Sequence, residues 1–284
     1  TDTYKKILFD YLYKKAKTKE QKNLIECLKK NGFYAVELND EMGNICKTLT
    51  RKTRGNLANL KYRIRDKFKK NIFRTLRIDE DVSEYKYLLD FIKEYTSLIC
   101  IDDEPKPYLQ LSSISNYKKL SFPELHDWHV DCIQPWFKIH IFLNVKNDMY
   151  LPYQFVPKGV FSSSEMHELY YLIADMTKEM NKNNQELSQS GQLSSMYCDS
   201  PLEKFLNLHN KKSNIVERLK NYFEYISFIS KNPLLVISDQ SLPHRKSIQA
   251  NSETREVITF LPYERLSMND FIRKAEIDIN QYDE

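Results

Sequence analysis

Four polar residues between positions 129 and 255 have the types and spacing of a metal site with a carboxylate clamp. His129 and Asp131 are separated by one residue, and Arg255 follows His244 after a short interval. Two imidazoles and one carboxylate can occupy one face of an octahedral metal and leave three positions open, as non-haem Fe(II) oxygenases require. An arginine at this place can hold the far carboxylate of a 2-oxoglutarate cosubstrate, because a planar guanidinium matches a carboxylate fork. The pattern indicates a reaction class and leaves the substrate open.

The segments next to these residues have the patterns of strands that would position them. Phe137–Val145 alternates and is rich in β-branched and aromatic residues, Leu234–Ser238 is a short apolar run, and Arg255–Leu261 has a similar composition. The turn 239–243 separates the second run from His244. Each candidate ligand therefore lies at a strand end or loop edge, where a rigid sheet can hold it within the tolerance that a metal demands.

The order and spacing of these pieces resemble the phytanoyl-CoA dioxygenase-like branch of the Fe(II)/2-oxoglutarate oxygenases. The resemblance covers about residues 20–265 and is densest over 126–260. Upstream, Leu28–Glu37 is similar to the family's opening helix, Gly-turn and first strand. The segments that carry the resemblance are Trp128–Asp131, Lys138–Val145, Leu151–Lys158, Ser238–Arg245 and Thr254–Val257.

The chain departs from the family pattern at two places near the expected pocket mouth. Leu151-Pro152 stands where the family often has Gly-Pro, and Pro157-Lys-Gly-Val160 stands where Pro-Gly-Ser-His often follows. Because these positions shape the mouth of the pocket, the family's substrate is not carried over.

The resemblance implies that His129, Asp131 and His244 bind Fe(II). With O2 as cosubstrate, 2-oxoglutarate would be converted to succinate and CO2 while a substrate is oxidised. The metal and cosubstrate would carry out the oxidation, and the protein would position the reactants and exclude water. Asp131 favours hydroxylation, or another oxidation such as desaturation, because related halogenases have a small residue in its place.

Three further residues are implied in binding 2-oxoglutarate. Arg255 would pair with its distal carboxylate. Ser247, three residues beyond His244, would add a hydroxyl donor to the same carboxylate, and Lys138 is a weaker candidate for that pocket. Arg255 also argues against a cupin-like zinc hydrolase, which needs no distal carboxylate clamp.

The expected fold class is α+β, with a double-stranded β-helix (jelly-roll or cupin-like) core. We expect a mainly helical, basic region over 1–100 that packs on the core, and an oxygenase core over 101–265. A helical insertion occupies about 161–230, and a C-terminal helix or tail occupies 266–284. The insertion lies between the two halves of the core, so it is either a lid over the active-site mouth or a scaffold on the back of the barrel.

Hydrophobic spacing predicts the main elements outside the core. Tyr4–Lys30 has a helical pattern, Gly32–Leu38 is typical of a short strand, and Asp79–Leu98 is typical of an amphipathic helix. Within the insertion, strands are not expected between Phe161 and Ser230. The helical predictions there are a Ser-x-x-Glu start at Ser162 leading into 166–180, then Leu202–Leu208 and Asn214–Ile229, after a polar loop over 181–192.

The remaining histidines favour structural roles. His126 is expected in a loop, and His167 and His209 in helical segments at the surface. His140 alternates with isoleucines on the predicted strand and is expected to be packed or solvent-facing, with a pocket-facing position as the alternative.

Cysteine usage and hydropathy favour a reducing, cytoplasmic setting. The chain has 5 Cys, an odd number without a CxxC pair. There is no leading apolar run like a signal peptide, and no apolar stretch of about 18 residues that would span a membrane.

Charge is concentrated in the first quarter of the chain. Residues 1–74 hold 20 Lys and Arg against 8 Asp and Glu, whereas the rest hold 23 against 31. A charge run is usually a solvated face, and its functional alternative is an anionic partner such as an acidic carrier, a glycan, an anionic membrane surface or nucleic acid. Nucleic acid is the least supported, because no zinc-finger or RNA-recognition signature accompanies the run over 51–70.

Two hypotheses of different classes follow. The first is an Fe(II)/2-oxoglutarate-dependent hydroxylase acting on a small molecule or biosynthetic intermediate, either anionic or carrier-bound. The alternative is a non-catalytic binding protein whose basic N-terminal region binds an anionic partner. The substrate, the position oxidised, the kind of product and the oligomeric state are not determined by the sequence.

Overall fold

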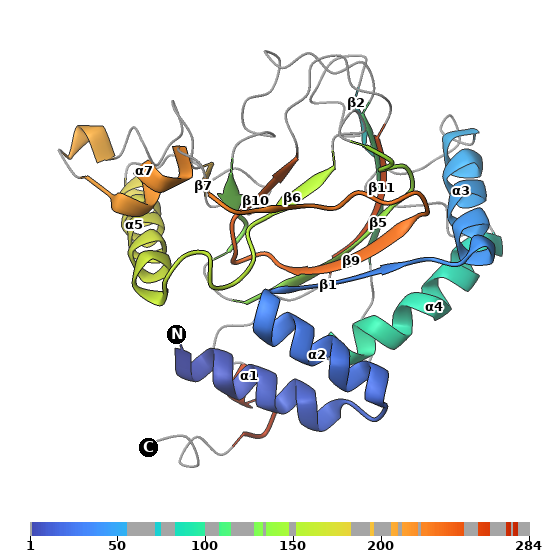
Figure 1. Cartoon of the computed structure of the whole chain (residues 1–284), viewed down its shortest axis with the longest axis horizontal. Helices are drawn as coiled ribbons and strands as arrows, with labels where there is room; N and C mark the ends of the chain where they lie inside the picture. The colour runs from blue at the N-terminus through green and yellow to red at the C-terminus, as the bar shows by residue number, and fades with distance from the viewer. Residues whose placement is uncertain are drawn as a thin grey trace.

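Two antiparallel β-sheets form the centre of the computed structural model, with helices against the outer face of one sheet and at one end of the pair (Figure 1). The structure describes residues 2–55, 72–74, 83–99, 108–114, 128–132, 135–147, 152–182, 194–195, 206–209, 212–220, 223–246, 255–261, 271–273 and 275–277. The helices are α1 (Asp2–Lys15), α2 (Lys19–Asn31), α3 (Asp40–Gly55), α4 (Ser83–Ile99), α5 (Ser163–Lys182) and α7 (Asn214–Lys220).

The larger sheet has the order β1-β9-β5-β11-β3-β2 and the smaller sheet has the order β7-β4-β10-β6-β8. All the strand pairings in both sheets are antiparallel. The strands of the larger sheet are β1 (Phe33–Glu37), β2 (Ile72–Arg74), β3 (Tyr108–Ile114), β5 (Phe137–Phe142), β9 (Leu234–Asp239) and β11 (Arg255–Leu261). Those of the smaller sheet are β4 (His129–Val130), β6 (Tyr153–Phe155), β7 (Ser194–Ser195), β8 (Ile226–Ser227) and β10 (His244–Lys246).

Strands β5 and β9 of the larger sheet are buried or half-buried along their whole length, and alternation along the strands divides the core in two. On β5, Ile139 and Ile141 belong to the cluster shared with the N-terminal helices, while Phe142 belongs to the cluster shared with the smaller sheet. On β11, Ile258 points to the helices and Val257 points to the smaller sheet. Because side chains alternate with a period of two, one face of each strand faces the interior between the sheets.

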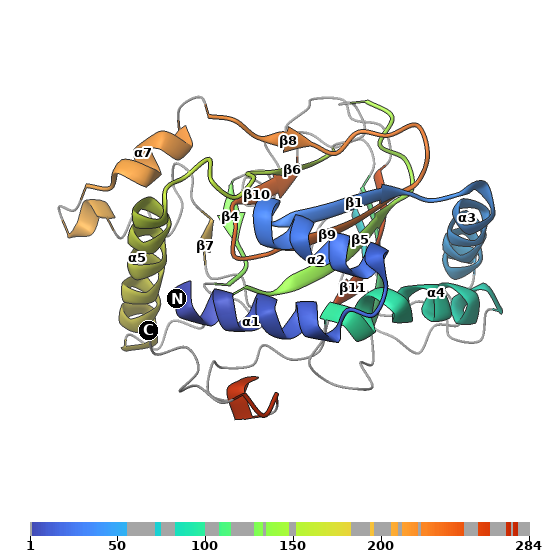
Figure 2. The same ribbon diagram turned by 60° about the horizontal axis from the view of Figure 1, so that its bottom comes forward.

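The N-terminal helices cover the outer face of the larger sheet, and α1, α2 and α4 lie across it in Figure 2. Their buried residues include Ile7, Leu12, Ile25 and Leu88, which join the isoleucines of the sheet in one cluster. The N-terminal region also contributes β1 and β2 to this sheet, so its backbone is hydrogen-bonded into the core as well as packed upon it.

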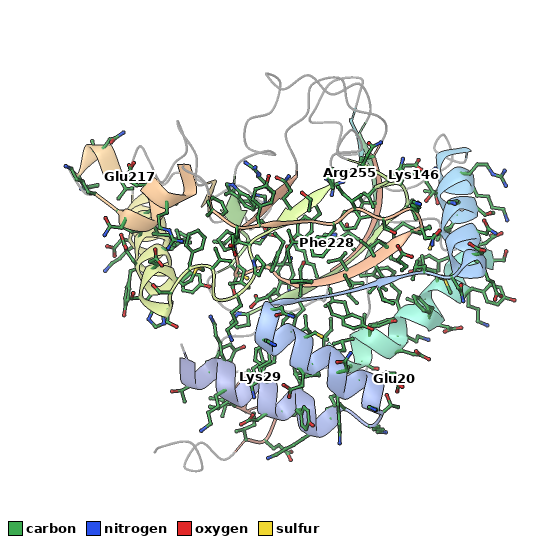
Figure 3. The ribbon with its side chains drawn as sticks, viewed as in Figure 1. Glu20, Lys29, Lys146, Glu217, Phe228 and Arg255 are labelled. Carbon is green, nitrogen blue, oxygen red and sulfur yellow. The ribbon has the colours of Figure 1, made fainter. Side chains whose placement is uncertain are left out.

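Aromatic side chains fill the space between the sheets. Tyr153 of β6 stacks against Phe142 of β5 at a centroid distance of 5.8 Å, and its hydroxyl lies 3.2 Å from Ser238 Oγ on β9. Phe228 lies between the sheets in Figure 3, where it contacts both Phe33 and Tyr153. These contacts connect the two sheets next to the candidate site.

Several predicted elements are confirmed, and some predictions are wrong. The expected strand and helix near 32–38 and 79–98 correspond to β1 and α4, and β11 has the predicted bounds. The helical pattern over Tyr4–Lys30 is divided into α1 and α2, because Thr18 caps α2 in a capping box with Gln21.

The insertion differs from expectation in its strands. The prediction that strands stop between Phe161 and Ser230 is wrong, since β7 and β8 both pair with the smaller sheet. The helix predicted over Asn214–Ile229 is shorter in the structure, because α7 ends at Lys220 and Ile226–Ser227 forms strand β8. The predicted start of α5 is confirmed, because Ser162 and Glu165 form reciprocal hydrogen bonds. The loop predicted over 181–192 lies mostly outside the described residues.

In the described part of the chain, no helix combines the length and the apolar character needed to cross a membrane.

Candidate metal centre

His129, Asp131 and His244 lie together between the sheets, with one potential ligand atom of each within 4.8 Å of the others. His129 Nε2 is 3.8 Å from Asp131 Oδ1, and His244 Nε2 is 3.9 Å from Asp131 Oδ2. The two imidazole rings have a centroid distance of 4.4 Å. Asp131 and His244 are buried, and the side chain of His129 is 12% exposed. The three side chains thus converge on one small space.

Strand pairing explains this convergence. His129 and His244 are direct partners in the antiparallel pair β4–β10, so their side chains lie side by side on one face of the sheet. Asp131 is two residues beyond His129, which returns its side chain to the same face. The backbone N–H of Asp131 donates to Gln240 O at 2.9 Å, which fixes this residue against the turn that precedes His244.

The charges around Asp131 keep its carboxylate ionised. Burial alone would raise its pKa, but the ammonium of Lys138, followed by interactions with the His244 and His129 side chains, holds the pKa of Asp131 below its usual value. The buried Oδ1 atom has no hydrogen-bond partner among the residues that the structure describes. A buried anionic oxygen in this condition is costly unless a cation binds it, so the donor set fits a divalent metal.

His244 is oriented by a neighbouring carbonyl. Its Nδ1 lies 2.9 Å from Leu242 O, and because a carbonyl accepts, Nδ1 carries the proton and Nε2 is left as the electron-pair donor. Burial, and then the charge of His129, lower the pKa of His244 to about 3. The imidazole is therefore neutral over the physiological range, which is the state that binds a metal.

Lys138 of β5 lies against the triad. Its Nζ donates to Asp131 Oδ2 and is 4.8 Å from the centroid of the Trp136 ring. In this position the ammonium balances the buried carboxylate. The structure thus places Lys138 beside a proposed metal ligand, whereas the sequence favoured it only as a minor contributor to the 2-oxoglutarate pocket.

Arg255 enters the same interior from β11. It is buried, and its guanidinium lies 5.2 Å from the centroid of the Phe142 ring. Arg255 is at the beginning of its strand, near the upper end of β11 in Figure 3. The charges of both Arg255 and Asp131 act on the pKa values of His140 and Tyr153. These two rings therefore lie close enough to interact with the arginine and with the metal-ligand candidates.

The inner wall of the site includes His140 and Tyr153, of which the sequence did not single out Tyr153. His140 was expected to be packed or solvent-facing, with a pocket-facing position as the alternative. It faces the space between the sheets, with its Nδ1 3.1 Å from Thr259 Oγ1 and its ring 5.5 Å from that of Tyr153. Burial and the charges of Lys138 and Arg255 hold the pKa of His140 well below its usual value. Alternation with Lys138 and Phe142 on one strand is the signal that indicates this orientation.

Some predicted residues have other surroundings. Ser247 and His126 lie outside the described residues. His167 is on α5, away from the triad, and lines a separate cavity. Trp128 is buried against Phe223, with a ring centroid distance of 5.0 Å, and has the guanidinium of Arg245 over its ring.

The insertion contacts the turn that carries His244. Tyr170 of α5 donates its hydroxyl to Ser241 O at 2.9 Å, and Leu169 and Ile173 of this helix are buried in the cluster between the sheets. The helix therefore supports one end of the sandwich next to the site. The two roles predicted for the insertion, a lid over the active-site mouth and a scaffold on the back of the barrel, both stay predictions.

Comparisons with known proteins gave structural likeness only. No family model matches the chain, and no curated protein matches it. A crystal structure of AviO1 from Streptomyces viridochromogenes Tue57 is 12% identical, covers 89% of this chain and 99% of its own, and gives a TM-score of 0.47. HygX from Streptomyces hygroscopicus, with nickel and 2-oxoglutarate bound, is 8% identical with coverages of 87% and 88% and a TM-score of 0.46. The epimerase SnoN, in complex with Fe3+, alpha ketoglutarate and nogalamycin RO, is 8% identical with coverages of 84% and 82% and a TM-score of 0.47.

Proposed function

We propose that this protein is an Fe(II)- and 2-oxoglutarate-dependent oxygenase with a double-stranded β-helix core of the phytanoyl-CoA dioxygenase-like kind. The observation that carries the proposal is the buried convergence of His129, Asp131 and His244 in an interior that Arg255 also enters. Two imidazoles and one carboxylate on one side of a metal leave coordination positions for a cosubstrate and O2.

Each residue has a defined task in this proposal. His129, Asp131 and His244 would hold Fe(II), and Arg255 would bind the distal carboxylate of 2-oxoglutarate through charge-assisted hydrogen bonds. Ser247 and Lys138 are proposed as additional donors to that cosubstrate. When bound, the iron supplies the redox chemistry by which O2 and 2-oxoglutarate give succinate, CO2 and an oxidised substrate.

The side chains around the centre supply orientation and exclude water. The carbonyl of Leu242 accepts from His244 Nδ1 and leaves Nε2 as the atom that would bind the metal, and Tyr153 and Phe142 form an apolar wall on the inner side. Lys138 keeps the Asp131 carboxylate ionised before the metal binds. We propose hydroxylation of a small molecule, or of a carrier-bound intermediate, because Asp131 supplies the carboxylate that halogenases lack. The cytoplasmic location expected from the cysteines stays a prediction.

The test requires no knowledge of the substrate. Fe(II) and 2-oxoglutarate are added without O2 to the purified protein, and the visible charge-transfer band between iron and the bound keto acid is recorded. We expect a band in the wild type, no band in His244→Ala, and a band in Arg255→Ala that needs at least about tenfold more 2-oxoglutarate, since a charge-assisted carboxylate contact is lost.

The outcomes separate the two functional classes. A folded wild-type protein that binds iron and gives no band would overturn the oxygenase proposal. It would favour the alternative, a non-catalytic protein that uses its basic N-terminal region to bind an anionic partner. Lys67→Gln combined with Lys69→Gln is the matched control, since both substitutions lie in that region and leave the band unchanged if the protein is an oxygenase.

A further inference from the structure

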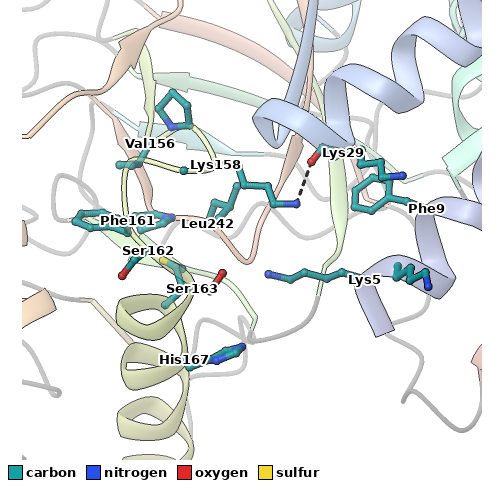
Figure 4. A pocket seen from close by; sticks show the side chains of 15 residues that line it. Lys5, Phe9, Lys29, Val156, Lys158, Phe161, Ser162, Ser163, His167 and Leu242 are labelled. Carbon is teal, nitrogen blue, oxygen red and sulfur yellow. Dashed lines mark hydrogen bonds between the residues drawn. The ribbon is translucent and has the colours of Figure 1, made fainter. Parts of the chain in front are cut away.

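A second cavity of about 410 Å³ lies between α1, the end of α2, the segment after β6 and the start of α5 (Figure 4). None of the proposed metal or cosubstrate residues lines it. Its fifteen lining residues include four lysines and one histidine, and no carboxylate. We call this cavity the lysine pocket, after Lys5, Lys6, Lys29 and Lys158.

Lys5 and Lys6 come from α1, Lys29 comes from α2, and Lys158 comes from the segment after β6. Lys5 and Lys158 reach into the pocket from opposite walls in Figure 4. The Nζ of Lys158 donates to Lys29 O at 3.0 Å, a contact that holds this ammonium at the pocket and links the segment after β6 to the end of α2. Because the lining carries lysines and no carboxylate, an anion bound beside Lys5 and Lys158 is favoured.

Acidic side chains near the pocket are paired in part with its lysines and in part with other residues. Asp10 lies 3.9 Å from the Nζ of Lys29 and offsets part of that one charge. Glu165, in the first turn of α5, accepts from the backbone N–H of Ser162 and forms an ion pair with Arg218. Lys5 also interacts electrostatically with the buried carboxyl of Asp239. The lining itself contains four lysines and no carboxylate.

The rest of the lining is apolar. Phe9, Phe161, Met166 and Leu242 are buried and form the non-polar part of the wall. Small-molecule sites typically have volumes of roughly 300–1,000 Å³ and combine an apolar lining with a few polar groups that fix orientation. The cavity is thus larger than an inorganic anion requires.

We propose that the lysine pocket binds a small molecule that carries a phosphate group and an apolar part. A phosphate monoester has a charge of about −1.5 to −2 at neutral pH and three acceptor oxygens, so it matches several ammonium groups better than a single carboxylate does. The apolar part of the ligand contacts the phenylalanine and leucine side chains of the wall.

The pocket is adjacent to the metal centre but separate from it. Leu242 and Pro243 line the pocket, and the next residue is His244. Pro243 O accepts from the N–H of Val156, which closes the wall at this point. The binding of a phosphate compound to the lysine pocket therefore does not depend on the oxygenase proposal, and it is expected to persist in His129→Ala.

Calorimetric titration of the full chain tests this inference, with phenyl phosphate as the probe and with inorganic phosphate, phenol and benzoate as comparison ligands at equal ionic strength. We expect phenyl phosphate to bind most tightly. Lys5→Gln and Lys158→Gln should each weaken its binding roughly tenfold, because each removes a charge-assisted contact. Lys14→Gln is the matched control, because this exposed lysine of α1 does not line the pocket.

Several results would overturn the inference. One is an equal loss of affinity in Lys14→Gln and Lys5→Gln, which would indicate general attraction to a basic surface. Another is loss of binding in His129→Ala with retention in Lys5→Gln, which would locate the phosphate at the metal centre. Binding to vesicles that contain phosphatidic acid without binding to phenyl phosphate would replace the small molecule with a lipid surface. Circular dichroism verifies that each variant is folded.

Discussion

At the scale of the residue, the candidate centre is a buried carboxylate surrounded by positive charge. The ammonium of Lys138 donates to one oxygen of Asp131. The other oxygen has no hydrogen-bond partner among the described residues. A metal bound to His129 and His244 would bring a double positive charge to the same carboxylate. Lys138 and the metal therefore compete for Asp131, since both neutralise it.

Replacing Lys138 should have opposite effects on the metal-free and metal-bound proteins. In Lys138→Gln, Asp131 loses its counter-charge, and the metal-free protein should lose about 3 kcal/mol of unfolding free energy, the scale for breaking a buried ion pair. Its affinity for Co(II), used as a spectroscopic substitute for Fe(II), should rise about tenfold because a competing cation is removed. Denaturant unfolding and Co(II) titration measure the two quantities.

Lys146→Gln is the matched control, since this lysine is exposed and follows the same strand. We expect wild-type behaviour from it in both measurements. Weaker Co(II) binding in Lys138→Gln would contradict competition and would mean that the lysine supports the metal-bound arrangement.

At the scale of the element, one glycine connects the N-terminal helices to the metal site. Gly32 ends α2 with a φ of 81°, and its N–H donates to Leu28 O, an arrangement that favours glycine. A β-carbon at Gly32 would overlap the Cδ1 atom of Leu242. Leu242 in turn provides the carbonyl that orients His244, so α2, the turn before β10 and the metal ligand form one packed unit.

Gly32→Ala should therefore impair both stability and metal binding. We expect a loss of about 2–4 kcal/mol, from the left-handed backbone and from the overlap with Leu242, together with at least about tenfold weaker Co(II) binding. Gly159→Ala is a close control, because Gly159 also has a positive φ, 96°, but has nothing within 4 Å of the added β-carbon. The control should lose about 1 kcal/mol and keep its metal affinity. Equal metal affinities in the two variants would show that displacing the Leu242 side chain does not change the orientation of His244.

At the scale of the whole molecule, the packing of the two sheets against each other determines the pKa values of the side chains between them. His140 and Lys138 come from β5 and Arg255 from β11, whereas Asp131 follows β4 and His244 begins β10. Their mutual interactions exist only when the sheets face each other. Burial, followed by the charges of Lys138, Arg255 and His244, lowers the pKa of His140, and Asp131 opposes this effect.

This environment predicts acid sensitivity of the metal-free protein. In the unfolded chain His140 takes up a proton near its ordinary pKa of 6.5, whereas in the folded protein it stays neutral to a much lower pH. Because the unfolded state then binds more protons, stability is highest above pH 6.5 and falls as the pH drops below it. Urea unfolding at pH 7 and pH 5 measures this loss.

His140→Gln should reduce the loss of stability between pH 7 and pH 5 by up to about 2 kcal/mol, because each unit of pH difference is equivalent to about 1.4 kcal/mol for one proton. His209→Gln, at an exposed position, is the matched substitution and should follow the wild type. An unchanged pH dependence in His140→Gln would show that this imidazole does not resist protonation in the fold.

The sequence alone determined the ligand candidates and the strands beside them. His129, Asp131 and His244 were identified by residue type and order, and β5, β9 and β11 by their β-branched and aromatic composition. These features are local: coordination chemistry depends on residue type, and strand formation depends on a period-two pattern that a single sequence contains. The short strands β7 and β8 were missed because two residues carry no measurable periodicity.

Only the tertiary structure decided which side chains share the interior. Pairing of His129 with His244 across β4 and β10 depends on strand register, which the sequence around either residue does not contain. The contact of Lys138 with Asp131, the inward orientation of His140, and the convergence of Lys5 and Lys158 on one cavity likewise join distant segments. The physical reason is that residue type determines which interactions a side chain can make, whereas packing of the sheets and helices determines which partners come within reach.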